Sequence, residues 1–238
     1  MPTPAYTIVC TKKALVAPGV YELRFTRPEG MTFKAGQFVL FDVPLVEDRT
    51  NIQARAYSIA SAPGETELLF GVKLKEGGRA SMWIEQVIQE GTPVRIQGPF
   101  GLFLVKETDP ACIFIATGAG VAPFRSQLID LLEEKKDTRP MHVLFGVRHP
   151  QDFFWLQDFM SLARAYPNFV FHPVLSGDDE SWTGLRGHVQ QHLPSINAAH
   201  PDAGIYICGA PEMVKDVKET CLTDFGIPKI RLHAEGYI

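Results

Sequence analysis

Cysteine is scarce in this sequence of 238 residues, and the four that occur, Cys10, Cys112, Cys208 and Cys221, stand far apart. No C-x2-C or C-x4-C-x2-C spacing is present, which excludes a zinc or iron–sulfur site built from neighbouring cysteines. Isolated thiols in a reducing compartment are usually small buried apolar residues. We expect this of Cys10, Cys112 and Cys221, and we expect neither an iron–sulfur cluster nor a metal site in this chain.

Long apolar runs and a strong net charge are also missing. No stretch of about 18 to 20 apolar residues could span a bilayer, and the N-terminus lacks the charged-then-apolar layout of a signal peptide. We therefore expect a cytoplasmic protein without membrane insertion. The net charge is −4, with no basic stripe of the kind that nucleic-acid binding requires. The expected partner is a small molecule or another protein, and not a nucleic acid.

Short β-rich runs separated by turn signals fill the first part of the chain, from YTIVCTKKALV to GTPVRIQGPFG. Closely spaced short strands predict an antiparallel barrel or sandwich, and we expect a Greek-key β-barrel over residues 1–106. One segment departs from this pattern, because Ala80 to Gln89 carries apolar residues at helical spacing and is followed by Gly91. We expect a single helix there.

After Pro110 the pattern changes to solid apolar runs separated by longer amphipathic segments. This change predicts a doubly wound α/β domain over residues 107–238, with a parallel sheet of five strands. The expected strands are CIFIAT, MHVLFGV, FVFHPVLS, IYICGA and IRLHAEG. The expected helices lie near residues 122–136, 152–166, 186–193 and 211–225.

A glycine-rich motif, Gly118-Ala119-Gly120-Val121-Ala122-Pro123, directly follows the first of these apolar strands. Such a turn lets backbone N–H groups approach a pyrophosphate at a helix N-terminus. Proline suits the first helical turn, since the N–H that it lacks would be unpaired there. Pro123 nevertheless departs from the usual dinucleotide fingerprint. Taken alone, the motif is explained equally well by a tight strand-to-helix turn without a ligand.

The order of four short motifs is more specific than any one of them. Arg55-Ala56-Tyr57-Ser58 stands in the barrel, Gly78-Arg79-Ala80-Ser81 opens the single helix, the glycine motif follows, and Cys208-Gly209 ends the fourth parallel strand. In this order the sequence resembles the ferredoxin–NAD(P)+ reductase family, especially the reductase components of bacterial oxygenases. The resemblance covers essentially the whole chain and implies an enzyme that binds FAD and uses NAD(P)H.

The resemblance implies a flavin site in the barrel, around the motif that includes Ala56. Arg55 would pair with a flavin phosphate through its planar guanidinium, Tyr57 would lie against one ring face, and Ser58 would hydrogen-bond near N5. Without a ligand, a surface salt bridge would explain Arg55 and barrel packing would explain Tyr57. The residues implied to hold the FAD pyrophosphate are Gly78, Arg79, Ala80 and Ser81.

The resemblance also implies a dinucleotide site and a catalytic group in the second domain. Thr117 would border the gap between nicotinamide and flavin, and Cys208, followed by Gly209, would face the nicotinamide near C4. Alternatively, Cys208 is a structural thiol at a strand end. Glu235 would join Ser58 and Cys208 as a catalytic residue. The residues implied to receive the pyrophosphate of NAD(P)H are Gly118, Gly120, Val121 and Pro123.

Near the C-terminus, Tyr237 matches an aromatic residue that can shield the other face of the flavin in members of this family. Here Ile238 follows this aromatic residue. That departure from the family pattern leaves the stacking role of Tyr237 open.

Two features of the sequence disagree about the preferred dinucleotide. Arg148 follows the second parallel strand, where it could meet the 2′-phosphate of NADPH. Ser176 also belongs to the expected site, but it is followed by Gly177, Asp178 and Asp179, and those carboxylates would repel a phosphate dianion. We favour NADH on this ground.

Three functions remain open at this level. The first is a reductase with bound FAD that passes electrons to a separate protein, such as a ferredoxin or an oxygenase component. The second is a flavin reductase that uses free flavin as its substrate. The third is a flavin-bearing subunit of a larger complex. The pyrophosphate site at Gly78 to Ser81 favours the first.

Overall fold

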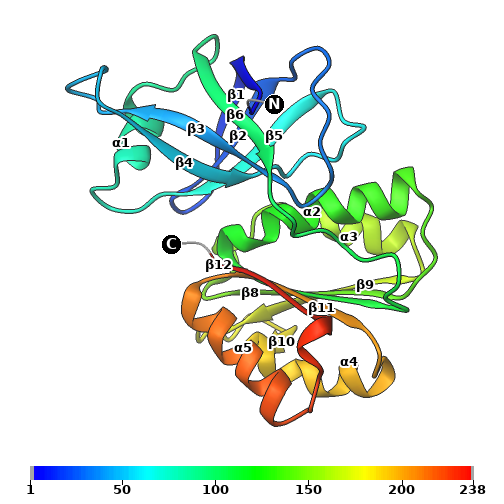
Figure 1. The fold of residues 1–238 in the computed structure, drawn as a ribbon. Helices are drawn as coiled ribbons and strands as arrows, with labels where there is room; N and C mark the ends of the chain where they lie inside the picture. Colours follow the sequence, from blue (N-terminus) through cyan, green and yellow to red (C-terminus); the bar gives the residue numbers. More distant parts are fainter. Residues whose placement is uncertain (1–2, 237–238) are drawn as a thin grey trace.

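The computed structural model describes residues 3–236, and its ribbon shows two stacked halves (Figure 1). One half is a six-stranded antiparallel sheet with a single helix, and the other is a six-stranded parallel sheet between layers of helices. The expected fold class, an antiparallel barrel followed by a doubly wound α/β fold, is thereby confirmed. The linker between the two sheets comprises residues 101–111.

The first sheet, called the barrel below, has the Greek-key strand order β4-β3-β6-β1-β2-β5. Alternate side chains point inward, as in β3, where Val39, Phe41 and Val43 are buried between half-buried neighbours. Aromatic rings fill the interior, and Phe41 lies edge-on to Phe25 and Phe70 at centroid distances of 5.6 and 4.9 Å. The strands are β1 (Ala5–Ala17), β2 (Val20–Thr26), β3 (Phe38–Pro44), β4 (Ile52–Ser58), β5 (Glu67–Lys73) and β6 (Pro93–Phe100).

The expected single helix of the barrel is present as α1, Arg79–Gln86. Its Trp83 and Ile84 are buried in the barrel core, which is why the apolar spacing predicted a helix at this place. Because α1 follows β5 directly, its N-terminus lies beside the barrel strands rather than in the α/β half.

The second sheet is parallel and has the order β10-β9-β8-β7-β11-β12. It contains six strands, so the prediction of five was wrong by one. The additional strand, β10, consists of only Leu185 and Arg186, which pair with the end of β9. A run of two residues is too short to show an apolar pattern. The strands are β7 (Cys112–Thr117), β8 (Met141–Val147), β9 (Phe169–Leu175), β10 (Leu185–Arg186), β11 (Gly204–Gly209) and β12 (Leu232–Gly236).

Helices cover both faces of the parallel sheet, with α2 and α3 on the side of the barrel and α4 and α5 on the opposite side (Figure 1). The first helix of the α/β half, α2, continues with π geometry from Asp130 onwards. The third helical region lies at residues 189–199 rather than at 186–193, because Gly187 has a φ of +93° and His188 caps the turn that follows. The helices are α2 (Ala122–Ile129), α3 (Leu156–Ala165), α4 (Leu193–Ala199) and α5 (Pro211–Thr223); shorter turns are η1 (Gly118–Val121), η2 (Asp130–Glu134), η3 (Pro150–Asp152), η4 (Val189–His192) and η5 (Lys229–Arg231).

The expectation for the cysteines is confirmed, since Cys10, Cys112 and Cys221 are all buried. Burial raises the pKa of the Cys112 and Cys221 thiols to about 12, so both are protonated at neutral pH. Within residues 3–236, no three His, Cys, Asp or Glu side chains are arranged to hold a metal ion. None of the helices in this part of the chain is long and apolar enough to cross a membrane.

A buried hydrogen bond joins the two halves of the molecule. The indole Nε1 of Trp155 donates to Oε2 of Glu22 on β2 at 2.7 Å, and Glu22 is only 5% exposed. Lys12 and Arg24 pair with the other oxygen of this carboxylate, at 3.1 and 3.0 Å. These three donors hold the pKa of Glu22 below its ordinary value although burial opposes them. The carboxylate is therefore charged, and it needs the indole as a donor.

A second group of contacts at the same seam is centred on Arg125 of α2. Its buried guanidinium donates to the Ala60 carbonyl and to Glu65 of the barrel, each at 3.0 Å, and it lies over the Trp155 ring at 5.6 Å. The neighbouring Ser126 donates to the Ser61 carbonyl at 2.7 Å. The relative orientation of the two halves is thus set by specific polar contacts as well as by apolar packing.

Replacing Trp155 by Phe should destabilise the protein by about 1–3 kcal/mol, because it leaves a buried carboxylate oxygen without its donor. The matched control is Trp182→Phe, which removes an indole bond to the Leu185 carbonyl in a half-buried loop. We expect the control to change stability by less than about 1 kcal/mol. Urea unfolding measures both, and equal losses in the two variants would contradict the importance of the Glu22 contact.

Candidate functional site

Strand β4 is an end strand of the barrel, hydrogen-bonded to β3, and it is unusually exposed for a strand. The side chains of residues 52–54 and Ala56 face solvent, and Ile52 is 53% exposed. Edge strands present N–H and C=O groups that are not used in the sheet. An apolar strand surface beside such groups suits a flat ligand that is apolar on its faces and polar at its edges.

Arg55 and Tyr57 stand on this strand. The Arg55 guanidinium is half-buried and donates to the Ala54 carbonyl and to the Gln53 side chain, at 2.8 and 2.6 Å. The Tyr57 ring packs edge-on against Phe41 at 5.3 Å, and burial raises its pKa to about 12. Tyr57 is therefore a neutral, fixed ring at the edge of the barrel core.

The N-terminus of α1 has the donor set that a diphosphate requires. Gly78 is the N-cap and offers no side-chain cap, and the first turn contains no acidic residue. The first N–H groups of the helix are therefore available to an anion. Arg79 bonds the Asn51 carbonyl and side chain at 2.8 and 3.0 Å, which ties this end of the helix to the start of β4. Ser81 accepts a bond from the Lys75 amide at 2.8 Å and can still donate its own proton.

Ser58, Cys208 and Glu235 come together although they are far apart in sequence. The Ser58 hydroxyl, at the end of β4, donates to Oε1 of Glu235 at 3.2 Å. Glu235 lies directly beside the buried Cys208 in the register of β11 and β12. Burial raises the pKa of the Glu235 carboxyl, and the bond from Ser58 opposes this only in part. A carboxyl of this kind keeps its proton to a higher pH than a free glutamate does.

The glycine motif forms the turn η1 and the start of α2, as its residues predicted. Gly118 has a φ of +51°, a conformation that favours glycine. Gly120 allows close packing, because a Cβ there would collide with the Cys208 carbonyl. The side chains of Val121 and Pro123 are buried in the protein core, so these residues present mainly their backbone to the turn. The motif therefore serves partly to pack β7 against β11.

A cavity of about 530 Å³ opens where β7, β8, β9 and β11 end. Thr117, Gly118, Arg148 and Ser176 line it, all of which the sequence predicted for the dinucleotide. The cavity lies at the point where the strand order reverses from β8 to β11 around β7, the usual ligand position in open α/β sheets. Its size is in the range of cofactor pockets.

Several predicted residues lie behind this cavity rather than in its wall. Gly120, Cys208 and Gly209 do not line it, but they form the packed turn on which the lining residues stand. Thr117 is held in place by the Ala210 amide, which donates to its hydroxyl at 3.2 Å. Tyr237 lies outside the described residues.

The sequence analysis missed the part of the cavity wall that comes from the barrel. Val20 of β2 and Lys73 of β5 line the cavity opposite the α/β residues. Both stand in ordinary strand patterns, so no local signal marked them. Phe154, which also lines the cavity, directly precedes Trp155 and its bond to Glu22. The seam contacts therefore set the width of this cavity.

Comparison with known proteins agrees with this geometry. Residues 7–104 match the model of the oxidoreductase FAD-binding domain, and residues 114–219 match that of the oxidoreductase NAD-binding domain. The chain is 35% identical over 232 residues to ferredoxin–NADP reductase B of Sorangium cellulosum, covering 93% of both chains. It is 32% identical to the reductase component of phenol 2-monooxygenase from a Pseudomonas species, covering 90% of this chain but 60% of that relative.

Solved structures show the same fold. A ferredoxin NADP+ reductase from Neisseria gonorrhoeae with bound FAD and NADP superposes with a TM-score of 0.84, at 24% identity and 98% coverage of each chain. The cytochrome P450 reductase of Amycolatopsis gives a TM-score of 0.83 at 25% identity, covering 99% of this chain and 71% of that one. With both domain models matched in order and a relative aligned over nearly its full length, the chain belongs to the ferredoxin–NAD(P)+ reductase family of FAD-dependent oxidoreductases.

Proposed function

We propose that this FAD- and NAD(P)-binding oxidoreductase passes electrons from NAD(P)H to a separate acceptor protein, such as a ferredoxin or an oxygenase component. The observation that carries the proposal is the Ser58–Glu235 contact, which unites the end of the exposed strand β4 with the edge of the dinucleotide half. The names of the relatives support it, since one is a ferredoxin–NADP reductase and another is the reductase component of an oxygenase. We take the FAD-binding domain to end at residue 106, inside the linker.

The FAD site is assigned to β4 and α1. Arg55 and the free N–H groups at Gly78 to Ser81 would bind the phosphates, and Ala56 and Tyr57 would lie along the ring. When bound, FAD accepts a hydride from the nicotinamide and releases the electrons singly. The protein's contribution is to hold the two rings together and to exclude water between them.

Ser58, Cys208 and Glu235 are assigned to the reacting edge of that site. The Ser58 hydroxyl donates a hydrogen bond to Glu235. Its oxygen would then be free to accept a hydrogen bond from the flavin. The raised pKa of Glu235 allows this residue to hold a proton that the hydroxyl can exchange. Buried Cys208 would support the nicotinamide end of the site from behind the residues that line the cavity.

The dinucleotide is assigned to the cavity at the ends of the parallel strands. Thr117 and Gly118 would border the nicotinamide, and Arg148 and Ser176 the ribose region. Lys73 would add a positive charge from the barrel side of the cavity, so that a bound dinucleotide would contact both halves of the protein.

We propose NADH as the preferred dinucleotide. Three carboxylates, Asp152, Glu212 and Asp216, line the cavity against two cations, Lys73 and Arg148. Asp178 and Asp179 follow Ser176 in the adjoining loop. This excess of negative charge opposes the 2′-phosphate of NADPH more than the uncharged ribose of NADH.

Two other functions remain candidates. A flavin reductase would use the same exposed strand to hold flavin loosely, and a subunit of a larger complex would keep FAD but depend on partners for turnover. The uncapped helix start at Gly78 favours the first proposal over a free-flavin reductase, because a diphosphate site selects FAD.

Replacing Glu235 by Gln should lower kcat for NADH-dependent reduction of ferricyanide by about a hundredfold, the usual contribution of a positioned proton donor. Adding Ser58→Ala should cause little further loss, because the two groups act as one unit. The limb of the kcat–pH profile on which activity falls as pH rises, because Glu235 loses its proton, should have its midpoint above pH 4.5 in the parent protein and be absent from the Gln variant. Glu219→Gln, on the exposed face of α5, serves as the control. Additive losses would contradict the paired role.

The ratio of kcat/KM for NADH and NADPH tests the dinucleotide preference. We expect NADH to be the better substrate. Replacing Asp178 and Asp179 together by Ser should raise kcat/KM for NADPH and leave that for NADH nearly unchanged, since only the phosphate is repelled by the carboxylates. A preference of tenfold or more for NADPH in the parent protein would overturn this proposal.

A further inference from the structure

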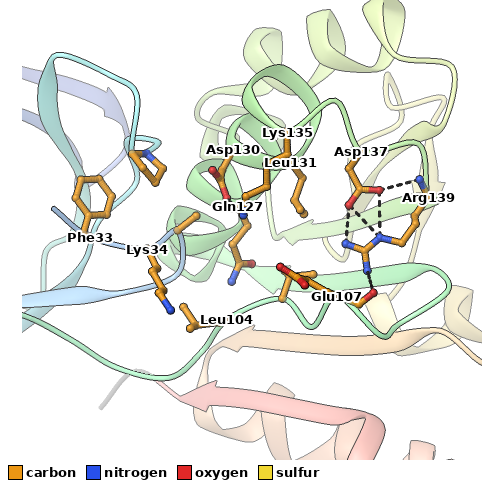
Figure 2. Close-up of a pocket in the computed structure, with 13 residues that line it drawn as sticks. Phe33, Lys34, Leu104, Glu107, Gln127, Asp130, Leu131, Lys135, Asp137 and Arg139 are labelled. Carbon is orange, nitrogen blue, oxygen red and sulfur yellow. Dashed lines mark hydrogen bonds and ion pairs between the residues drawn. The ribbon is translucent and has the colours of Figure 1, made fainter.

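A second cavity, of about 600 Å³, lies at the seam between the two halves and shares no lining residue with the dinucleotide cavity. Four parts of the chain form its walls: the segment before β3, the loop between β4 and β5 at Pro63, the linker after β6, and α2 with η2 and the turn that precedes β8 (Figure 2). None of the motif residues borders it. The assigned reaction therefore leaves this cavity without a role.

One part of the cavity wall is apolar. Phe33 and Ala35 come from the barrel side, Leu104 and Val105 from the linker, and Leu131 from η2. The guanidinium of Arg27 lies over the Phe33 ring, 5.1 Å from its centre, and helps to fix it. The apolar wall is thus a fixed surface contributed by both halves.

The remainder of the wall is ionic, and most of its charges neutralise one another. Asp130 pairs with Lys135 at 2.7 Å, and Asp137 pairs with Arg139 at 2.6 Å. Arg139 also donates to the carbonyl groups of Lys106 and Asp109, each at 2.8 Å, so its guanidinium is committed to holding the linker. Neither ion pair offers a net charge to a ligand.

Two opposite charges remain. Lys34 and Glu107 are exposed and line the same cavity, one from the barrel side and one from the linker (Figure 2). Among residues 3–236, neither the Lys34 ammonium nor the Glu107 carboxylate takes part in an ion pair or a side-chain hydrogen bond. The cavity therefore presents one positive and one negative group beside an apolar wall.

A buried amide in the wall adds an unused acceptor. Gln127 is 1% exposed, and its Nε2 donates to the Phe103 carbonyl at 2.6 Å. Its Oε1 is buried and has no hydrogen-bond partner in the described part of the chain. A buried acceptor without a donor costs about 1–3 kcal/mol, so an N–H group brought to this wall would be stabilising.

We propose that this cavity binds a small zwitterion with an apolar body, of the size of an apolar dipeptide. Its ammonium pairs with Glu107, its carboxylate with Lys34, and its side chains pack against Leu104 and Leu131. The volume is in the range that holds compact organic ligands. Because barrel, linker and α2 all contribute, one molecule contacts both halves of the protein without touching β4 or α1, to which the flavin is assigned.

Calorimetric titration of the FAD-containing protein with the dipeptide leucyl-phenylalanine tests this. The probe is compared with its N-acetylated form, which lacks the ammonium, and its C-amidated form, which lacks the carboxylate. We expect each capped form to bind about two- to fivefold more weakly, since each loses one exposed charge pair. Glu107→Gln should weaken binding of the free dipeptide but not of the acetylated form, and Lys34→Gln should do so for the free dipeptide but not for the amide.

Lys218→Gln and Glu219→Gln, exposed on α5 across the parallel sheet, are the matched controls and should leave all affinities unchanged. Thermal unfolding should show that Lys34→Gln and Glu107→Gln fold normally, because both side chains are exposed. Absence of binding at millimolar dipeptide, or equal affinity for the free and capped forms, would overturn the proposal. NADH turnover does not enter this measurement, so its outcome is separate from that of the proposed reductase function.

Discussion

The bond between the Trp155 indole and the buried Glu22 carboxylate is the contact on which the arrangement of the molecule depends. Each half contains only part of a site: the exposed strand and the uncapped helix belong to the barrel, and the cavity at the strand ends belongs mainly to the α/β half. Hydride transfer requires two rings to lie within contact distance. A change in the relative orientation of the halves would therefore separate the rings and slow the reaction. Arg125 reinforces the same orientation through Ala60 and Glu65.

Polar contacts suit this task better than apolar packing alone. An apolar seam tolerates sliding, whereas a charged carboxylate buried with three donors has one favourable position. The position of Phe154 in the cavity wall follows from the placement of Trp155 beside it. The second cavity, lined by Lys34, Glu107 and Gln127, lies at the same seam. The junction between the halves therefore borders both the dinucleotide cavity and the proposed dipeptide site.

Most helices, strands and local motifs could be predicted from the sequence, because they depend on residues that are close together in the chain. The glycine turn, the uncapped helix at Gly78 and the alternation of β3 depend on neighbouring residues. Strand β10 was missed because two residues carry no periodicity, and the third helical region was displaced because the turn at Gly187 was not recognised. Lys73 and Val20 reach the dinucleotide cavity only through tertiary packing, which leaves no trace in a single sequence.

The central claim is that one chain holds FAD beside an NAD(P)H site and transfers hydride between them. The absorbance spectrum of the purified protein, recorded before and after anaerobic addition of NADH, tests it most directly. The account predicts flavin bands in the resting protein that bleach when NADH is added. A colourless resting protein, or flavin bands that persist under excess NADH and NADPH, would contradict it.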